Sequence, residues 1–202
     1  MEKDNIYQTP SADLTIAESP EKNYAFFPTS NKKLLVLFFL TLGAYSIYWF
    51  YKHWSFQQKY MDKKISPALR SIFYIFFTHS LFKRIKIASE EKGIKTTLNF
   101  SALATLYIVL EIVSNGLDRA SMKTEYIGVL DYASIAILVP IVFPLYIVQR
   151  VANLVNGDPE GKLNSMFSVY NYIFIMIGIL FWSLVIVGLL QIDLSYLSQY
   201  VS

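Results

Sequence analysis

Long runs of apolar residues constrain the fold of this chain more than any other feature. Residues 34–54 form one such run, and its first formal charge is Lys52. Further apolar runs cover about residues 98–117, 128–150 and 169–191. The hydrocarbon core of a bilayer is about 30 Å thick, so a crossing helix needs roughly 20 predominantly apolar residues. We therefore predict an all-α fold, a polytopic membrane helix bundle with four transmembrane helices.

A shorter apolar segment lies between the first two of these spans. Ser66 followed by Pro67 is a typical helix start, with a capping hydroxyl and a proline at the first helical position. The 12 apolar and neutral residues between Arg70 and Lys83 are too few to cross a bilayer unaided. We predict one interfacial or re-entrant helix over about residues 66–90. The alternative is a fifth crossing at residues 70–85, lengthened by basic side chains that reach the interface at both ends.

The spans and their connections occupy residues 31–192 and leave no room for a separate soluble catalytic domain. Polar residues and prolines fill residues 1–30, which we expect to form a disordered N-terminal tail, with Ile6-Tyr7 and Phe26-Phe27 as its candidates for docking. Residues 193–202 are expected to form a polar C-terminal tail. The chain has no cysteine, and His53 and His79 lack a second ligand at metal-site spacing. No catalytic motif is present, so we predict no enzyme, no cofactor and no metal.

One face of the predicted second span is polar. Its members recur at the spacing of a helical face: Tyr107, Glu111, Ser114, Asn115 and Asp118. A carboxylate inside a span is costly, so Glu111 should face protein or a water-filled cavity. Two interpretations stay open. Glu111 is either a proton or cation site, or a carboxyl that bonds to a neighbouring helix or turns outward toward Arg119.

Two polar rows flank the loop between the predicted third and fourth spans. The first row is Gln149, Asn153 and Asn156, and the second is Asn164, Ser168 and Asn171. Helices joined by a short turn are antiparallel neighbours, so we predict that the rows hydrogen-bond to each other as a clamp across the hairpin. The alternative is a cytoplasmic binding site that includes Arg150.

Lysine and arginine in short loops mark the cytoplasmic side of a membrane protein. With four spans and the large first loop inside, 12 of the 18 basic residues lie inside and 6 outside. If residues 70–85 also cross, the split becomes 11 against 7. These counts leave the side of the N-terminus open. Both place the loop at residues 149–167 in the cytoplasm and the C-terminus outside.

Most of residues 26–190 also resembles a known family, most specifically in the first apolar run. The residues that carry the likeness are Phe27-Pro-Thr-Ser-Asn-Lys-Lys33, Val36-Leu-Phe38, Thr41-Leu-Gly43, Tyr45, Tyr48-Trp-Phe-Tyr-Lys52 and Trp54. Weaker likeness continues at Arg70, Phe77, Ser80-Leu-Phe82, Gln149-Arg150, Asn153, Asn164-Ser165 and Asn171. Together they are similar to a family of small bacterial multi-span inner-membrane proteins of unknown function. The resemblance implies a bacterial inner-membrane location and brings no site residues with it.

Three functions from different classes fit these observations, and the least favoured is an intramembrane enzyme that uses Glu111 or His79. The favoured one is a non-enzymatic accessory or scaffold subunit that binds other membrane proteins, or itself, through polar helix faces. The alternative is a small transporter or channel component that uses Glu111 as an intramembrane ion or proton site. A water-accessible cavity that reaches Glu111 would discriminate them, because only a transporter needs one. The basic residues flank membrane segments, which favours anionic lipid headgroups over nucleic acid as their partner.

Overall fold

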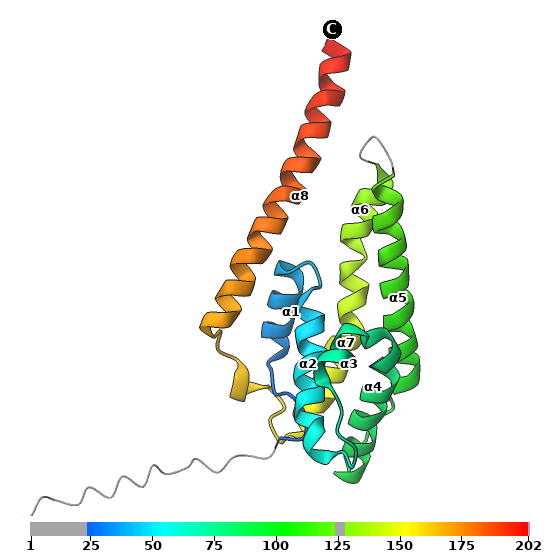
Figure 1. Cartoon of the computed structure of the whole chain (residues 1–202), viewed down its shortest axis with the longest axis vertical. Coiled ribbons are helices and arrows are strands. Elements are labelled where there is room, and N and C mark those ends of the chain that lie inside the picture. The colour runs from blue at the N-terminus through cyan, green and yellow to red at the C-terminus, as the bar shows by residue number, and fades with distance from the viewer. Residues whose placement is uncertain (1–23, 124–127, 202) are drawn as a thin grey trace, which may run out of the picture.

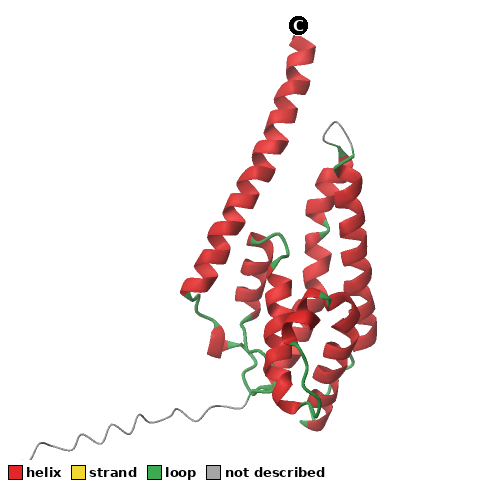
Figure 2. Cartoon of the chain, in the orientation of Figure 1, coloured by secondary structure: helices red, strands yellow, loops and turns green. Residues whose placement is uncertain are grey.

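The computed structural model describes residues 24–123 and 128–201, with side chains described through Leu189, and within these ranges it contains helices and no strand. The elements in chain order are α1 (Asn31–Leu40), α2 (Tyr45–Gln57), the short 3₁₀ helix η1 (Gln58–Tyr60), α3 (Pro67–Ile72), α4 (Tyr74–Glu91), α5 (Phe100–Ser121), α6 (Val129–Ala136), α7 (Leu138–Val155), the 3₁₀ helix η2 (Lys162–Asn164) and α8 (Val169–Val201). The predicted all-α class is confirmed (Figure 2).

Three helical segments among the described residues are long and apolar enough to cross a membrane. They are α5, the continuous stretch Val129–Val155 formed by α6 and α7, and α8 up to Leu189. The predicted spans at about residues 98–117, 128–150 and 169–191 therefore each correspond to a helix of sufficient length and hydropathy. The predicted fourth span, at residues 34–54, has no such helix, because this run is divided between α1 and α2.

That first apolar run folds as a helical hairpin. In Figure 1, α1 rises from the lower end of the molecule and α2 returns to it. The side chain of Gln57, at the end of α2, donates to the carbonyl of Ala25, which precedes α1, over 2.8 Å. Both ends of the hairpin thus lie at the same end of the molecule, and the prediction of one spanning helix over residues 34–54 is corrected to a hairpin of two shorter helices.

The turn of this hairpin, Thr41–Ala44, is fixed by local chemistry. Leu42 and Gly43 both have positive φ, at 51° and 84°, and the Gly43 N–H donates to the carbonyl of Phe38 over 2.8 Å. Such a left-handed ending is a common helix terminator. The Thr41 hydroxyl then donates to the Leu37 carbonyl and accepts from the Tyr45 N–H, so it closes α1 and starts α2.

The segment predicted as an interfacial helix at about residues 66–90 consists of α3 and α4, separated at Phe73. Ser66 caps α3 by accepting from the Leu69 N–H, and Pro67 takes its first position, as the sequence indicated. The third predicted span is also interrupted, at Ile137 between α6 and α7. Pro140 explains this break, because a proline ring clashes with the carbonyl four residues earlier, here that of Ala136. The last helix, α8, continues to Val201 instead of ending near residue 191, since no proline or glycine follows Gly188 to stop it.

Residues 24–30 are not part of a disordered tail. They form an extended segment whose Phe26 and Phe27 are buried, at 0% and 5% exposure. Their rings pack against His53 of α2, and Phe27 also contacts Tyr48 and Phe56. The docking alternative for Phe26-Phe27 is therefore the correct one, and the remainder of the predicted tail, residues 1–23, lies outside the described residues.

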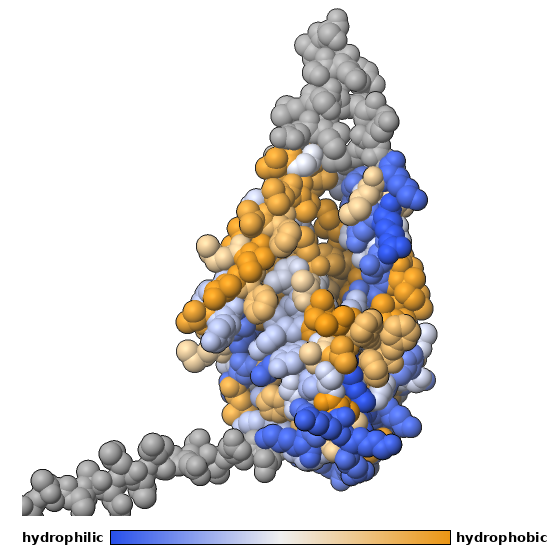
Figure 3. Space-filling view, in the orientation of Figure 1, coloured by the Kyte–Doolittle hydropathy of each residue, from blue (hydrophilic) through white to orange (hydrophobic). Residues whose placement is uncertain are grey.

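The two ends of the molecule differ sharply in charge. We call the end that holds residues 24–30, η1, the α4–α5 connection and the α7–α8 loop the basic end. Residues 24–99 and 150–168, which lead to it, contain 14 of the 16 lysines and arginines in the described ranges. The other two, Arg119 and Lys123, lie beside the α5–α6 connection at the opposite end. Hydrophilic surface accordingly gathers at the lower end in Figure 3.

Candidate functional site

The polar face of α5 lies against the tip of the α1–α2 hairpin. Tyr107 and Ser114 are buried, Glu111 is half-buried, and Asn115 and Asp118 are exposed. Asn115 donates to the backbone carbonyl of Glu111 on its own helix. All five predicted residues therefore share one side of α5, as their spacing required. In Figure 3 a hydrophilic strip follows the upper part of this helix.

The carboxylate of Glu111 is held by a neighbour that the sequence did not identify. The hydroxyl of Tyr74, the first residue of α4, donates to Glu111 Oε2 over 2.9 Å. The Tyr107 hydroxyl lies near the same carboxylate without reaching hydrogen-bond geometry. Tyr74 and Tyr107 pack against each other and against Phe50, so the acid sits at the edge of an aromatic cluster. One oxygen of Glu111 has a fixed partner, and the side chain also borders open space.

That open space is a cavity of about 230 Å³ between α5, α7 and the hairpin tip. A second cavity, of about 480 Å³, adjoins it and extends between α5, α6 and α8 toward the opposite end. The two share four lining residues: Leu42, Ser114, Asp118 and Leu138. They therefore form one path, which we call the acidic vestibule. It leads from the end opposite the basic end down to Glu111.

The ionisable side chains of the vestibule are all acidic. Glu111, Asp118 and Asp131 line it, and no lysine or arginine occurs among its described lining residues. Asp131 accepts from the Gly128 N–H and from the Ser121 hydroxyl, so it serves as a cap for α6. The carboxylate of Asp118 has no hydrogen-bond or ion-pair partner among the described residues. The vestibule therefore favours a cation over an anion.

The vestibule is closed toward the basic end. Below Glu111 lies a packed aromatic core, whose side chains are fully buried: Phe38, Trp49, Phe50, Trp54, Phe82 and Tyr107. Trp49 and Phe50 meet edge to face with their ring centroids 5.1 Å apart. Interiors packed in this way leave few voids larger than a water molecule. Among the described residues, the vestibule thus ends at Glu111 on the side of the basic end and extends away from it as far as Met122 and Leu189.

The amide side chains around the α7–α8 loop have a different role from the predicted one. Five carboxamides donate to five successive backbone carbonyls, those of Ala25, Phe26, Phe27, Pro28 and Thr29. In that order the donors are Gln57, Asn156, Gln149, Asn164 and Asn153, with donor–acceptor distances of 2.8, 2.8, 3.1, 2.9 and 2.9 Å. We call this set the carboxamide ladder. It pairs the backbone of an extended segment that would otherwise be buried without partners.

The prediction that the two rows clamp each other across the α7–α8 hairpin was therefore wrong. Gln149, Asn153, Asn156 and Asn164 bind residues 26–29 instead, and Asn171 accepts from the N–H and hydroxyl of Ser168 at the start of α8. The two helices run in opposite directions, as predicted, but they are not neighbours, because α1 packs against both of them and the segment at residues 25–29 binds the amides. Arg150 is exposed and takes no part in the ladder.

Gln149 is the centre of the ladder. Its Oε1 accepts from Trp49 Nε1 over 2.6 Å and contacts His53 Nε2 at 3.1 Å. Because this oxygen only accepts, His53 must carry its proton on Nε2. The Nε2 of Gln149 donates to the Phe27 carbonyl and to Asn153 Oδ1. One side chain thus joins α2, α7 and the extended segment.

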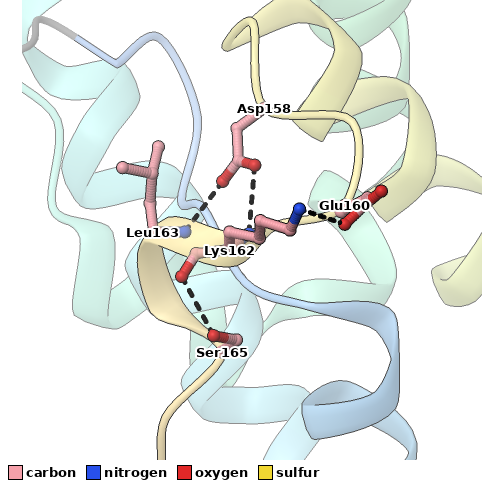
Figure 4. Close-up of polar contacts among 5 residues, drawn as sticks. All are labelled: Asp158, Glu160, Lys162, Leu163 and Ser165. Carbon is pink, nitrogen blue, oxygen red and sulfur yellow. Dashed lines mark hydrogen bonds and ion pairs between the residues drawn. The ribbon is translucent and has the colours of Figure 1, made fainter.

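The α7–α8 loop is also pressed against this segment. Both carboxylate oxygens of Asp158 accept backbone N–H groups, from Lys162 and Leu163, and Lys162 forms an ion pair with Glu160 (Figure 4). A Cβ on Gly161 would lie 2.5 Å from the Thr29 carbonyl oxygen. Lys33, almost fully buried, donates to Asn164 Oδ1 and to the Met166 carbonyl. These contacts hold the loop against the extended segment at the basic end.

Sequence reasoning missed several members of these sites. Tyr74 and Gln57 carried no motif signal, and Lys33 belonged to the family resemblance without a role attached to it. The partners of all three are far away in sequence. His53, set aside as a metal ligand, is a buried core residue, and His79 contacts the Thr105 hydroxyl on the surface. Among the described residues no three His, Asp or Glu side chains lie close enough to hold a metal ion.

Comparison with known proteins identifies no family model that matches this chain. It likewise finds no curated protein and no solved structure that matches.

Proposed function

We propose that the protein is a small transporter or channel component that moves protons or small monovalent cations across a membrane, with Glu111 as its intramembrane site. The observation that carries this proposal is the acidic vestibule, which reaches Glu111 from one end of the molecule. A scaffold needs no such path. An intramembrane carboxylate that borders a cavity is typical of proton and ion pathways.

The fold around the site supports the same function. Irregular backbone at membrane depth is tolerated only where it is buried in protein or lines a water-filled cavity. Here the turn of the α1–α2 hairpin lines the vestibule through Leu42, Gly43 and Ala44. Discontinuous helices of this kind form the substrate and ion sites of many transporters. Because the vestibule is sealed toward the basic end, movement of the hairpin would have to open the other side.

The polar helix faces, which first favoured a scaffold, are used internally. The amides of α7 bind residues 26–29, and the polar face of α5 lines the vestibule. Neither face is left to bind another protein. This use of the polar side chains favours transport over the accessory role.

The charge distribution supports an orientation for this proposed path. With the first apolar run folded as a hairpin, 14 basic residues of the described ranges belong to one end and two to the other. The basic end then faces the cytoplasm by the positive-inside rule, in a bacterial inner membrane. The α7–α8 loop is cytoplasmic, the C-terminus is external, and the vestibule opens to the outside.

Flux measurements on the purified protein in liposomes test the proposal. An imposed potential should drive proton or monovalent-cation entry, and Glu111→Gln, which keeps the shape and the bond from Tyr74, should abolish it. Glu160→Gln is the matched control, since Glu160 is an exposed loop carboxylate at the basic end. Equal flux through wild type and Glu111→Gln would refute the role of Glu111.

A further inference from the structure

Another cavity, of about 670 Å³, lies at the basic end between the end of α2, the exposed face of α4 and the end of α7. Its polar and cationic lining residues are Gln57, Tyr60, Ser80, Lys83, Arg84 and Lys92. Ala25, Phe26 and Val155 form its apolar wall. This basic pocket is separate from the acidic vestibule and shares no lining residue with it.

The cations of the basic pocket are not neutralised by the protein. Within the described residues the ion pairs join Lys86 to Glu90 and Lys162 to Glu160, and none involves a cation of the pocket. Arg84 makes one long bond, 3.4 Å, to Gln57 Oε1, and Lys92 donates to the carbonyl of Val155. Glu91 also lines the pocket, but the three cations outnumber it. The pocket therefore carries a net positive charge, and N–H donors of its lysines and arginine remain available to a ligand.

Arg70, on α3, adds further positive charge near the pocket. Arg70 stacks on the rings of Trp54 and Phe77, at 4.3 and 5.0 Å from their centroids. Burial and the positive charge of Arg84 both lower the pKa of Arg70. Arg70 does not line the pocket, so it adds positive charge beside the site and makes no contact within it. Within the pocket, the guanidinium of Arg84 matches the geometry of a phosphate, with which it can form paired charge-assisted hydrogen bonds.

The surroundings of the pocket indicate a lipid source for that anion. Phe76, Ser80, Lys83 and Ile87 follow one face of α4, and Phe76 is 79% exposed. Phe73, at the break before α4, is 53% exposed. Seven residues of helix separate Phe76 from Lys83, or about 10 Å. Val155 is the last residue of a spanning helix, so the pocket lies at headgroup level, with the exposed aromatic rings on its membrane side.

We propose that the basic pocket binds the phosphate of an anionic membrane lipid, with the acyl chains along Phe73 and Phe76. Arg84 and Lys92 supply the charge-assisted hydrogen bonds, and Lys83 closes the pocket on the solvent side. This is a defined site, which goes beyond the general attraction of basic loops to an anionic membrane surface.

Binding to the delipidated full-length protein in detergent tests this proposal, with native mass spectrometry and thermal shift as readouts. The probes are dioctanoyl phosphatidylglycerol, dioctanoyl phosphatidylcholine and inorganic phosphate. Phosphatidylglycerol should bind and stabilise more than either of the others. Arg84→Gln and Lys92→Gln should each weaken its binding by about tenfold or more, as expected for loss of a charged hydrogen bond. Lys83→Gln changes an exposed residue of the pocket, so it should fold normally and should also weaken the binding of phosphatidylglycerol.

Lys63→Gln and Lys64→Gln are the matched controls, because both lysines are exposed at the same end and lie outside the pocket. They should leave the binding of phosphatidylglycerol unchanged. An equal loss in these controls would mean diffuse surface attraction and would overturn the proposal. If inorganic phosphate binds as tightly as phosphatidylglycerol, the pocket is a site for free phosphate. If neither phosphatidylglycerol nor inorganic phosphate binds, the pocket is not an anion site. Both results contradict a lipid.

Discussion

Gln149 joins three separated parts of the chain, and its environment shows why a single amide was needed there. It lies in the interior at 0% exposure and faces donors on one side and acceptors on the other. The indole N–H of Trp49 needs an acceptor, and the carbonyl of Phe27 needs a donor. A carboxamide supplies both from one planar group, which neither a carboxylate nor an apolar side chain does.

We predict that Gln149→Leu destabilises the protein by about 3 kcal/mol or more, since each buried polar group left without a partner costs about 1–3 kcal/mol. Arg150→Gln, one residue further along α7, is the control, because Arg150 is exposed and should change stability by less than about 0.5 kcal/mol. Unfolding titrations in mixed micelles measure both values. Similar stabilities for the two variants would contradict the central role of Gln149.

At the scale of elements, the sequence predicted helices well where length and hydropathy decide the outcome. The spans at α5, α6–α7 and α8 follow from long apolar runs, and the capped start of α3 follows from Ser66-Pro67. The hairpin in residues 34–54 could not be found this way, because Thr41, Leu42, Gly43 and Ala44 are too neutral to interrupt a hydropathy run. Gly43 is the only glycine in this run, and a single glycine in an apolar run does not predict a hairpin.

The carboxamide ladder also could not be predicted from the sequence, for a different reason. The spacing of Gln149, Asn153 and Asn156 correctly placed them on one face of a helix. Their partners, however, are backbone carbonyls of residues 25–29, and every residue has such a carbonyl. The one sequence signal for that segment was the apolar pair Phe26-Phe27, which was one of two candidates for docking in the predicted tail. For Glu111 the sequence offered a cavity and a bond to a neighbouring helix as alternatives. It could not identify Tyr74, which belongs to another helix and carries no pattern.

The docking of the α7–α8 loop against the extended segment gives a prediction at this scale. Gly157 and Gly161 have similar positive φ, 73° and 65°, but only Gly161 lies against another backbone, that of Thr29. Gly157→Ala should cost about 1 kcal/mol of left-handed strain. Gly161→Ala should cost at least about 2 kcal/mol, because the new methyl group must also displace Thr29. Equal costs in an unfolding titration would show that the contact contributes nothing.

At the scale of the whole molecule, the hairpin links topology to the proposed transport. Four complete spans would put 12 of the 18 basic residues on one side and 6 on the other, a weak bias. A hairpin returns the chain to its starting end, so 14 of the 16 basic residues in the described ranges belong to one end of the molecule. The same turn places Leu42–Ala44 beside Glu111, where they line the vestibule. Charge asymmetry and cavity therefore have one structural cause.

The most direct test of the account is whether water reaches Glu111 from the end opposite the basic end. The chain has no cysteine, so a single introduced thiol reports its own environment. Ser114 lines both parts of the vestibule, whereas the adjacent Val113 is exposed on the outside of α5 and would face lipid. Thiols react as thiolates, which form in water and not in hydrocarbon.

A membrane-impermeant cationic thiol reagent is therefore added to each side of oriented liposomes that contain Ser114→Cys or Val113→Cys. The account predicts that Ser114→Cys reacts only from the side of the C-terminus and loses its cation flux, while Val113→Cys stays unreactive. Failure of Ser114→Cys to react from that side, or reaction of both variants at the same rate, would contradict a water-filled path to Glu111.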